Sequence, residues 1–387
     1  MRLYLPAFLL ALCTSTLATT SSVPATVVVA FNRTSVLPVI VEGAADRATG
    51  RQVSANDPVR IASISKLIMA LATLRLVDEG RVALNVDVSD YLGWSLRSPY
   101  YSNTPVTLAQ LLSHRAGLRD DVGYVVALGE SLQDKLKGPQ AWYAGAPPGE
   151  APFEYANLGS PIVATVLEAA TGERYDALVE RTVFSPLGIE ACLNWLRCNS
   201  KLQQHAVVLY RYGGDVARDN ADDLPPNCTI PLADGVDCDL SRYRPGENAS
   251  VFSPQGGVRM GMVDLAKLGQ TLLNLEQNEF LSPSSRTLLF ETGLHHHRAQ
   301  SFFCAYGLGI QKIEASGSEC EDRLMDDGVA RWGHAGEAYG LRAGIWLSPQ
   351  TGQGVAYFTT AVPDRLGSED EGGFDDREIS LMKRAAQ

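Results

Sequence analysis

The segment from Ser63 to Gly80 constrains the fold of this chain most, because it predicts a long buried helix early in the sequence. It contains no Pro or Gly before Gly80, and the glycine at its end predicts a C-terminal cap. Its apolar residues recur at helical spacing, at Leu67, Met69, Ala70, Leu71, Leu74, Leu76 and Val77. The segment is therefore predicted to be a buried amphipathic helix around which the rest of the chain is organised.

Ser63 and Lys66 lie on the same face of this helix, about one turn apart, so the amine can reach the hydroxyl. A serine hydroxyl is a poor nucleophile at neutral pH and needs a proton acceptor. The positive end of a helix and a backbone N–H there can stabilise an oxyanion. The pair thus predicts a nucleophile beside a base, although a two-residue pattern also fits a helix-capping serine and a solvated lysine.

Composition sets the class of protein and excludes some partners. The 387 residues are 45% hydrophobic and 20% charged, enough for one large domain or two intimate ones. The net charge is −11 and no basic run of five or more residues occurs, so we expect no nucleic-acid partner. After the N-terminal region, no apolar stretch is long enough to predict a membrane span.

The N-terminus predicts export. Met1-Arg2 is followed by an apolar run from Leu3 to Leu12, and Thr16-Leu17-Ala18 resembles a cleavage site. We therefore expect residues 1–18 to be a signal peptide and the mature chain to be secreted or periplasmic. The apolar run is too short to cross a bilayer.

The cysteines support the same compartment. Of seven cysteines, Cys13 lies in the signal, and an even number remains for disulfides. We expect nearest neighbours to pair; a zinc site is the alternative, but no Cys-x-x-Cys occurs. The His295–His297 run is interpreted as an exposed loop, so we expect neither a metal nor another cofactor. The remaining cysteines are Cys192, Cys198, Cys228, Cys238, Cys304 and Cys320.

Strand patterns occur at both ends of the chain. Thr26 to Phe31 and Val36 to Glu42 predict two strands joined by a short polar turn, whereas Lys66 to about Glu276 is mostly helical. Alternating or apolar runs return near the C-terminus as YGLGIQKI, VARWGHAGE, GLRAGIWLSP and GVAYFTTAV. Gln350-Thr351-Gly352-Gln353 predicts a hairpin between the last two, and hence an antiparallel sheet.

Two segments in the helical region have recognisable local chemistry. Thr107 and Gln110 form a capping-box pattern ahead of a helix that stops near Gly117, and His114 within this segment is expected to be structural. Tyr155-Ala156-Asn157 directly precedes an amphipathic helix that ends at Gly172. Alone, a Tyr-x-Asn tripeptide is common in loops.

The run IASISKLIMALATLRLVDEGRVALNVDVSDYL resembles the nucleophile helix of the serine β-lactamase and penicillin-binding protein family. The resemblance is to the branch with class C β-lactamases, D-aminoacyl peptidases and β-lactamase-like esterases. TLAQLLSHRAGL is similar to another segment of the family, and Tyr155-Ala156-Asn157 resembles its Tyr-x-Asn element. His334-Ala335-Gly336 resembles the third element, which is Lys-Thr-Gly in many β-lactamases and His-x-Gly in peptidase-like and esterase-like relatives.

The resemblance implies an α+β fold. Its antiparallel sheet is built from both chain ends and flanked by helices, with a mostly helical lobe inserted. We expect residues 23–387 to form the hydrolase domain, with the sheet part in 23–62 and 305–387 and the helical lobe in 63–304.

The resemblance also implies catalytic roles for Ser63, Lys66 and Tyr155 in two-step acyl transfer. A phenol with a pKa of ~10 becomes a useful base only if a cation such as Lys66 favours its phenolate. Substrate-binding roles are implied for Asn157, whose amide suits a substrate amide, and for His334, Gly336 and Glu337. The N–H of Glu337 is expected to complete the oxyanion hole with that of Ser63.

Two departures from the β-lactamase pattern bear on the substrate. A histidine with a pKa of ~6.5 at position 334 is mostly uncharged at pH 7, and Glu337 adds a negative charge where small residues are usual. Both predict weaker capture of an anionic β-lactam. We therefore expect a serine hydrolase of small-molecule or peptide substrates, acting on peptide, amide or ester bonds. The alternatives are a true β-lactamase and a non-catalytic binding protein on the same fold.

Overall fold

The computed structural model describes residues 23–217, 228–294, 302–314, 320, 322–363 and 373–387. The segment expected to be a signal peptide and the His295–His297 run lie outside the described residues.

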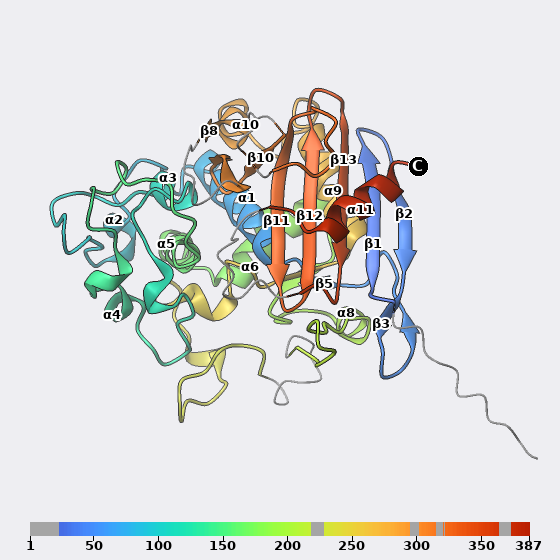
Figure 1. Cartoon of the computed structure of the whole chain (residues 1–387). Coiled ribbons are helices and arrows are strands. Elements are labelled where there is room, and N and C mark those ends of the chain that lie inside the picture. The colour runs from blue at the N-terminus through green and yellow to red at the C-terminus, as the bar shows by residue number, and fades with distance from the viewer. Residues whose placement is uncertain (1–22, 218–227, 295–301, 315–319, 321, 364–372) are drawn as a thin grey trace, which may run out of the picture.

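An antiparallel sheet of eight strands joins the two ends of the chain, in the order β2-β1-β13-β12-β11-β10-β9-β8 (Figure 1). This confirms the expected α+β fold with a sheet built from both chain ends. One edge strand, β8, falls in the range expected for the helical lobe. The strands are β1 (Thr26–Asn32), β2 (Val36–Glu42), β8 (Thr292–Leu294), β9 (Ala305–Gly307), β10 (Gln311–Ile313), β11 (Arg331–Ala338), β12 (Leu341–Ser348) and β13 (Gln353–Thr359).

Both faces of the central strands are covered, and the alternation of side chains explains how. In β1, Val27 and Val29 belong to the main core, whereas Val28 belongs to a separate core on the other face of the sheet. Helix α9 (Met262–Leu273) packs on the first face, against β1, β12 and β13. Helix α11 (Asp376–Ala385) covers the other face (Figure 1), where Tyr357 donates a 2.6 Å hydrogen bond to Glu378.

Helices α2, α3, α4 and α5 lie together in a lobe beside the sheet (Figure 1), and most residues of α1 are buried. The predicted glycine end of α1 is present, since Gly80 has a φ of 66° just after the helix. The predicted capping box of Thr107 and Gln110 is confirmed. The helices are α1 (Ser65–Asp78), α2 (Ser89–Leu92), α3 (Leu108–Leu112), α4 (Leu132–Leu136), α5 (Gly159–Thr171), α6 (Tyr175–Val179), α7 (Ser185–Leu187), α8 (Ser200–Gln204) and α10 (Pro283–Phe290).

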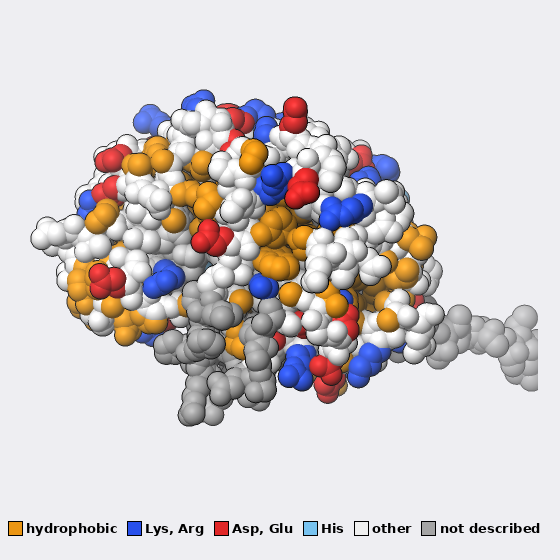
Figure 2. All heavy atoms as spheres, turned by 90° about the horizontal axis from the view of Figure 1, so that it is seen from above, with side chains coloured by type: hydrophobic (Ala, Val, Ile, Leu, Met, Phe, Trp, Pro, Cys, Tyr) orange, Lys and Arg blue, Asp and Glu red, His pale blue; other side chains and the backbone are white. Residues whose placement is uncertain are grey.

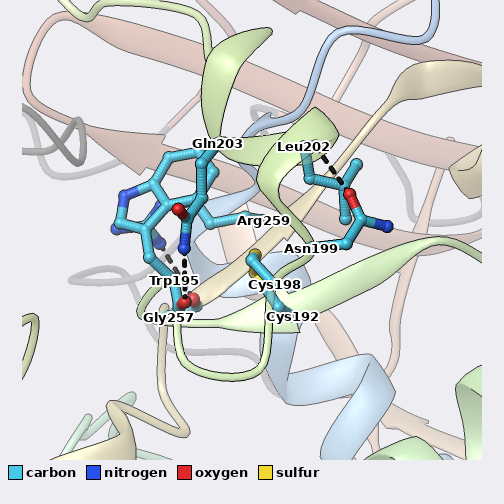
Figure 3. Close-up of a disulfide and its surroundings, with 8 residues drawn as sticks. All are labelled: Cys192, Trp195, Cys198, Asn199, Leu202, Gln203, Gly257 and Arg259. Carbon is cyan, nitrogen blue, oxygen red and sulfur yellow. Dashed lines mark hydrogen bonds between the residues drawn. A yellow bond between two sulfur atoms is a disulfide. The ribbon is translucent and has the colours of Figure 1, made fainter.

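A small three-stranded sheet connects the lobe to the start of α1. Its order is β5 (Val59–Arg60), β7 (Val258–Met260) and β6 (Ala191–Leu193). Figure 3 shows that the Cys192–Cys198 disulfide closes the turn after β6, beside Trp195 and Arg259. The other disulfides are Cys228–Cys238 and Cys304–Cys320, so the predicted nearest-neighbour pairing is confirmed. A separate two-stranded hairpin contains β3 (Ala44–Asp46) and β4 (Arg51–Gln52).

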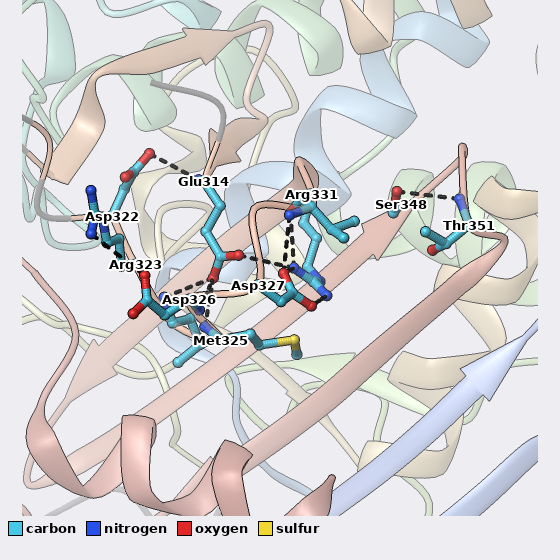
Figure 4. A network of polar contacts seen from close by, with 11 residues as sticks. Glu314, Asp322, Arg323, Met325, Asp326, Asp327, Arg331, Ser348 and Thr351 are labelled. Atoms are coloured by element: carbon cyan, nitrogen blue, oxygen red, sulfur yellow. Dashed lines mark hydrogen bonds and ion pairs between the residues drawn. The ribbon is translucent and has the colours of Figure 1, made fainter. Parts of the chain in front are cut away.

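A polar network fixes the chain where it enters β11 (Figure 4). The buried carboxylate of Glu314 accepts a 2.9 Å hydrogen bond from the N–H of Leu324 and lies 3.1 Å from the guanidinium of Arg331. Arg331 also pairs with Asp327 at 2.7 Å. Because Arg331 is the first residue of β11, this network sets the position of a strand that continues toward the start of α1.

Charged side chains of both signs are interspersed on the face of the molecule shown in Figure 2. Within the described ranges, no helix combines the length and apolar character needed to cross a membrane. The same ranges contain no group of three or more His, Cys, Asp or Glu side chains suited to a metal ion.

Candidate active site

Ser63 lies in a single 3-10 turn, Ala62–Ile64, between β5 and α1. The α-helix itself begins at Ser65, two residues later than predicted, because Ala62 adopts a φ of 47° before the chain turns into α1. A left-handed alanine costs about 1–3 kcal/mol, so the surrounding structure has to hold it. The N–H of Ile61 donates to Val258 on β7 at 3.0 Å, which fixes one side of the turn.

Strand β11 fixes the other side of the turn. A Cβ atom on Gly336 would lie 2.4 Å from the carbonyl oxygen of Ile61, so only glycine allows the strand to approach this closely. From the family resemblance, Gly336 was expected to bind substrate. In the structure, the space beside Gly336 is filled by the chain next to Ser63.

Lys66 is buried, with 1% of its surface exposed, and its amine faces the serine. The Nζ atom lies 3.2 Å from Ser63 Oγ, 2.7 Å from Asn157 Oδ1 and 3.3 Å from the carbonyl oxygen of Gln255. Burial lowers the pKa of Lys66 from 10.5 to about 7, although the negative charge of Asp120 acts in the opposite direction. A substantial fraction of the amine is therefore neutral near pH 7 and able to accept a proton.

The ring of Tyr155 lies beside the same amine, with its centroid 4.6 Å from Lys66 Nζ. It stacks on Phe303 at 4.4 Å between centroids. Burial raises the pKa of Tyr155 above its ordinary value of 10, and a hydrogen bond with Ser63 only partly offsets this. The predicted phenolate is therefore not favoured, because burial disfavours the charged form, and the phenol stays protonated at neutral pH.

Asn157 connects Lys66 to Asp120, an acidic residue that the sequence did not predict as part of the site. Its Oδ1 accepts from Lys66, and its Nδ2 donates to Asp120 at 3.0 Å. Asp120 also accepts hydrogen bonds from the N–H groups of Asn157 and Leu158, each at 2.9 Å. The amide expected to face the substrate is thus engaged by the protein on both sides. In the sequence, Asp120 lies in the long connection between α3 and α5, and long loops often line functional clefts.

His114 holds the loop that carries Tyr155, consistent with the structural role predicted for it. Its Nδ1 accepts a 3.2 Å hydrogen bond from the N–H of Ala156, and its ring lies 4.5 Å from that of Tyr155. Its carbonyl accepts from the N–H of Glu154 at 3.1 Å. These contacts fix the loop on both sides of the tyrosine.

His334 is buried behind Tyr155 and does not belong to the side chains that line the cavity at Ser63. Its ring lies 2.9 Å from the hydroxyl of Tyr306 through Nε2 and 2.6 Å from the carbonyl of Ala335 through Nδ1. Burial, assisted by the charge of Lys66, lowers the pKa of His334 from 6.5 to about 3. It is therefore neutral at pH 7, without the partial charge assumed from the sequence.

Glu337 does line the cavity, but its charge is compensated because it forms a close ion pair with Arg342. Glu337 was expected to add a negative charge that disfavours anionic substrates. The structure therefore weakens the electrostatic argument against anionic substrates.

The cavity at Ser63 has a volume of about 600 Å³ and is also bordered by Tyr155 and Asn157. Its lining includes two arginines, Arg60 and Arg211, whose guanidinium carbons lie 5.2 and 5.4 Å from the ring centroid of Tyr339. A different cavity, of about 730 Å³ and bordered by Trp94, Glu130 and Tyr243, contains none of the catalytic candidates. We therefore assign the chemistry to the cavity at Ser63.

Curated relatives match part of the chain. The D-alanyl-D-alanine-carboxypeptidase/endopeptidase AmpH of Escherichia coli K12 is 33% identical over 137 residues, covering 34% of this chain and 35% of that protein. Esterase EstB of Burkholderia gladioli is 34% identical over 165 residues, covering 39% and 42%. The chain thus matches less than half the length of either relative.

Solved structures match the fold over nearly the whole chain. A D-stereospecific amidohydrolase from Streptomyces sp. superposes with a TM-score of 0.63 at 19% identity, covering 95% of each chain. A D-amino acid amidase from Ochrobactrum anthropi SV3 gives a TM-score of 0.64 at 17% identity, covering 94% of this chain and 93% of the amidase. The sequence profile of the Beta-lactamase family matches residues 17–373. The chain therefore belongs to the Beta-lactamase family of serine hydrolases.

Proposed function

We propose that this chain is an exported serine hydrolase that cleaves peptide, amide or ester bonds through an acyl-enzyme on Ser63. The observation that carries the proposal is the buried amine of Lys66, 3.2 Å from Ser63 Oγ and with its pKa lowered to about 7. A non-catalytic protein gains nothing from burying a lysine at this position, because desolvating an amine is costly. The geometry therefore favours turnover over binding alone.

The reaction follows from the protonation states. Ser63 Oγ attacks the substrate carbonyl and its proton passes to neutral Lys66, while the N–H groups of Ser63 and Glu337 hold the oxyanion. The protonated phenol of Tyr155, hydrogen-bonded to Ser63, gives its proton to the leaving group and regains one from Lys66. Water then attacks the acyl-enzyme by the same proton route and releases the acid.

The substrate class is proposed from the relatives and from the cavity. A carboxypeptidase, an esterase and D-amino acid amidases are among the similar proteins. The neutral, buried state of His334 supports weak β-lactam capture. The two arginines in the cavity are the observation that favours the alternative, a true β-lactamase, since they can attract a substrate carboxylate.

Purified protein assayed with nitrocefin, p-nitrophenyl butyrate and a D-alanyl-D-alanine peptide separates these functions, with Ser63→Ala as the control. We expect Ser63-dependent ester hydrolysis and only weak nitrocefin cleavage. Nitrocefin turnover at the rates of resistance enzymes would establish the β-lactamase instead. Complete absence of Ser63-dependent turnover would support the other alternative, a non-catalytic binding protein on the same fold.

Export is proposed from chemistry as well as from the N-terminal pattern. Disulfides are typical of oxidising compartments and rare in the cytosol, so the three disulfides support export. Secretion of the mature chain with an N-terminus near residue 19 is the expected result of expression with its own leader.

A further inference from the structure

Two tyrosines from different parts of the chain, Tyr124 and Tyr339, border the cavity at Ser63 and remain accessible there. Each is 37% exposed, and Val125, which also lines the cavity, is 45% exposed. Tyr124 comes from the long connection between α3 and α5, whereas Tyr339 directly follows β11. Neither tyrosine takes part in the proposed proton transfers, so the reaction does not explain why both lie at this cavity.

Tyr339 occupies a backbone position that favours other residues. Tyr339 and Gly340 form the two-residue loop between β11 and β12, because Ala338 and Leu341 are the last pair in the register. Both loop residues have a positive φ, 51° and 74°, as in a type I′ turn. Asn-Gly and Asp-Gly are the preferred pairs in this turn, and a bulky side chain with a positive φ is rare. The turn therefore does not require tyrosine, and the ring at position 339 needs another explanation.

The surrounding contacts hold the ring of Tyr339 at the cavity. The guanidinium carbons of Arg60 and Arg211 lie 5.2 and 5.4 Å from the ring centroid. A Cβ atom on Gly340 would lie 2.5 Å from the carbonyl oxygen of Tyr210, so the tip of the hairpin packs closely against the residue before Arg211. The ring is thus held in place by the protein, while more than a third of the residue stays exposed for contact with a substrate.

Strand β11 places Tyr339 on the acyl side of the scissile bond. His334, earlier on the strand, lies with its ring centroid 6.2 Å from that of Tyr155, the proposed proton donor to the leaving group. The strand then runs past Glu337, whose N–H is the proposed oxyanion donor, and reaches Tyr339 two residues later. Two residues of an extended chain span roughly 7 Å. A phenyl ring joined to the substrate carbonyl through two methylene groups can cover this distance.

Tyr124 approaches the same space from the lobe. Burial, assisted by Tyr339 and Asp120, raises the pKa of Tyr124, and Arg60 acts in the opposite direction. These interactions require the groups to lie near one another, so the two tyrosines are close together although one comes from the lobe and the other from the sheet. Aromatic pairs are stabilised beyond the burial of their surface, so a ring next to both tyrosines is favoured over an alkyl chain.

We propose that Tyr124 and Tyr339 form a subsite for an aromatic group carried by the acyl part of the substrate, with Val125 extending its apolar wall. This specificity rests on the proposed function. It makes acyl groups that end in a phenyl ring preferred over short alkyl acyl groups. The competing occupant is a substrate carboxylate attracted by Arg60 and Arg211.

The test compares three p-nitrophenyl esters, namely the acetate, the 3-phenylpropanoate and the mono-ester of adipic acid. The second carries the ring, and the third ends in a carboxylate at a similar distance from the carbonyl. Each kcat/KM is divided by the rate of spontaneous hydrolysis of the same ester. Wild-type protein should prefer the phenylpropanoate over the acetate by about tenfold or more, the effect of burying much of a phenyl ring. The adipate mono-ester should rank below the phenylpropanoate.

Tyr339→Asn removes the ring and leaves the preferred Asn-Gly pair, so its melting temperature should stay within a few degrees of wild type. Its preference for the phenylpropanoate should fall by roughly three- to tenfold, mainly through loss on that ester. Val125→Ser should reduce the preference less, and it serves as the second variant if Tyr339→Asn does not fold. Tyr100→Asn is the matched control, because Tyr100 is 48% exposed and lies outside the lining of this cavity. It should keep the wild-type preference.

The outcomes separate the two proposals. A wild-type preference near one, or a preference unchanged in a folded Tyr339→Asn protein, overturns the aromatic subsite while Ser63-dependent hydrolysis stands. A preference for the adipate mono-ester over the phenylpropanoate also overturns it and assigns recognition to the arginines. No Ser63-dependent turnover of any of these esters by wild-type protein contradicts the proposed function itself.

Discussion

The amine of Lys66 and the hydroxyl of Ser63 lie 3.2 Å apart, inside a protein region where the amine is almost fully removed from water. Burial makes this lysine a base near neutral pH, because desolvation disfavours its charged form. The same burial keeps the phenol of Tyr155 protonated. The two groups therefore have different tasks, the lysine as proton acceptor and the tyrosine as proton donor.

The pH profile should report the lysine. Since only the neutral amine accepts the serine proton, kcat/KM should rise with pH through an apparent pKa of about 7 and level off above it. The measurement is kcat/KM for p-nitrophenyl butyrate across the neutral range. A profile without an acidic limb near pH 7 would argue against Lys66 as the base.

Asp120 should set the pH at which the acidic limb of this profile falls. Its negative charge stabilises the protonated form of Lys66, so Asp120→Asn should lower the pKa of the amine and move the limb to lower pH. Asp121→Asn is the matched control, because Asp121 is 57% exposed and pairs with Arg119 at the surface. If both variants shift the acidic limb equally, or neither shifts it, then the charge of Asp120 does not specifically raise the pKa of Lys66.

His334 should make the fold sensitive to acid. Its pKa is 6.5 in the unfolded chain and about 3 when folded, so the folded state excludes a proton that the unfolded state binds. The associated stability is present above pH 6.5 and is lost as the pH falls toward 3. Between pH 7 and about pH 4.5, the loss amounts to roughly 2.5 kcal/mol.

His334→Gln lacks this titration, so its free energy of unfolding should approach that of wild type as the pH falls. Urea unfolding of both proteins at the two pH values measures the difference. The exposed His205, replaced by Gln, is the control. A constant gap between wild type and His334→Gln would show that the buried histidine is not the group that titrates.

Gly336→Ala should displace the turn that carries Ser63. The new Cβ would lie 2.4 Å from the carbonyl oxygen of Ile61, so β11 or the turn that carries Ser63 has to shift. We expect a loss of roughly 1–3 kcal/mol in unfolding free energy and a slower acylation of Ser63. Gly213→Ala is the control, since the nearest atom to its added Cβ is 4.0 Å away. Wild-type stability and acylation in Gly336→Ala would contradict the close approach.

Local patterns in the sequence predicted most of the fold. The helix before Gly80, the capping box at Thr107 and the hairpin at Gln350–Gln353 each depend on residues close together in the chain. The short edge strand β8 was missed because three residues carry too little periodicity. The family resemblance supplied the arrangement of the two chain ends in one sheet.

The site was only partly predictable, because its chemistry depends on burial and on distant neighbours. Nothing near Asn157 in the sequence shows that Asp120 would bind its side-chain amide. Likewise, nothing near Lys66 shows that its amine would donate to the backbone carbonyl of Gln255. The uncharged state of His334 follows from the side chains that enclose it, and those come from other segments. A sequence pattern supplies the residue type, whereas the surroundings set its protonation state.

The most direct test of the central claim is mass analysis of the folded protein after exposure to a fluorophosphonate, followed by peptide mapping. The account predicts one adduct per chain, on the peptide that contains Ser63, and none on Ser63→Ala. An adduct on another residue in the wild-type protein, or none at all, would contradict the assignment of Ser63 as the nucleophile.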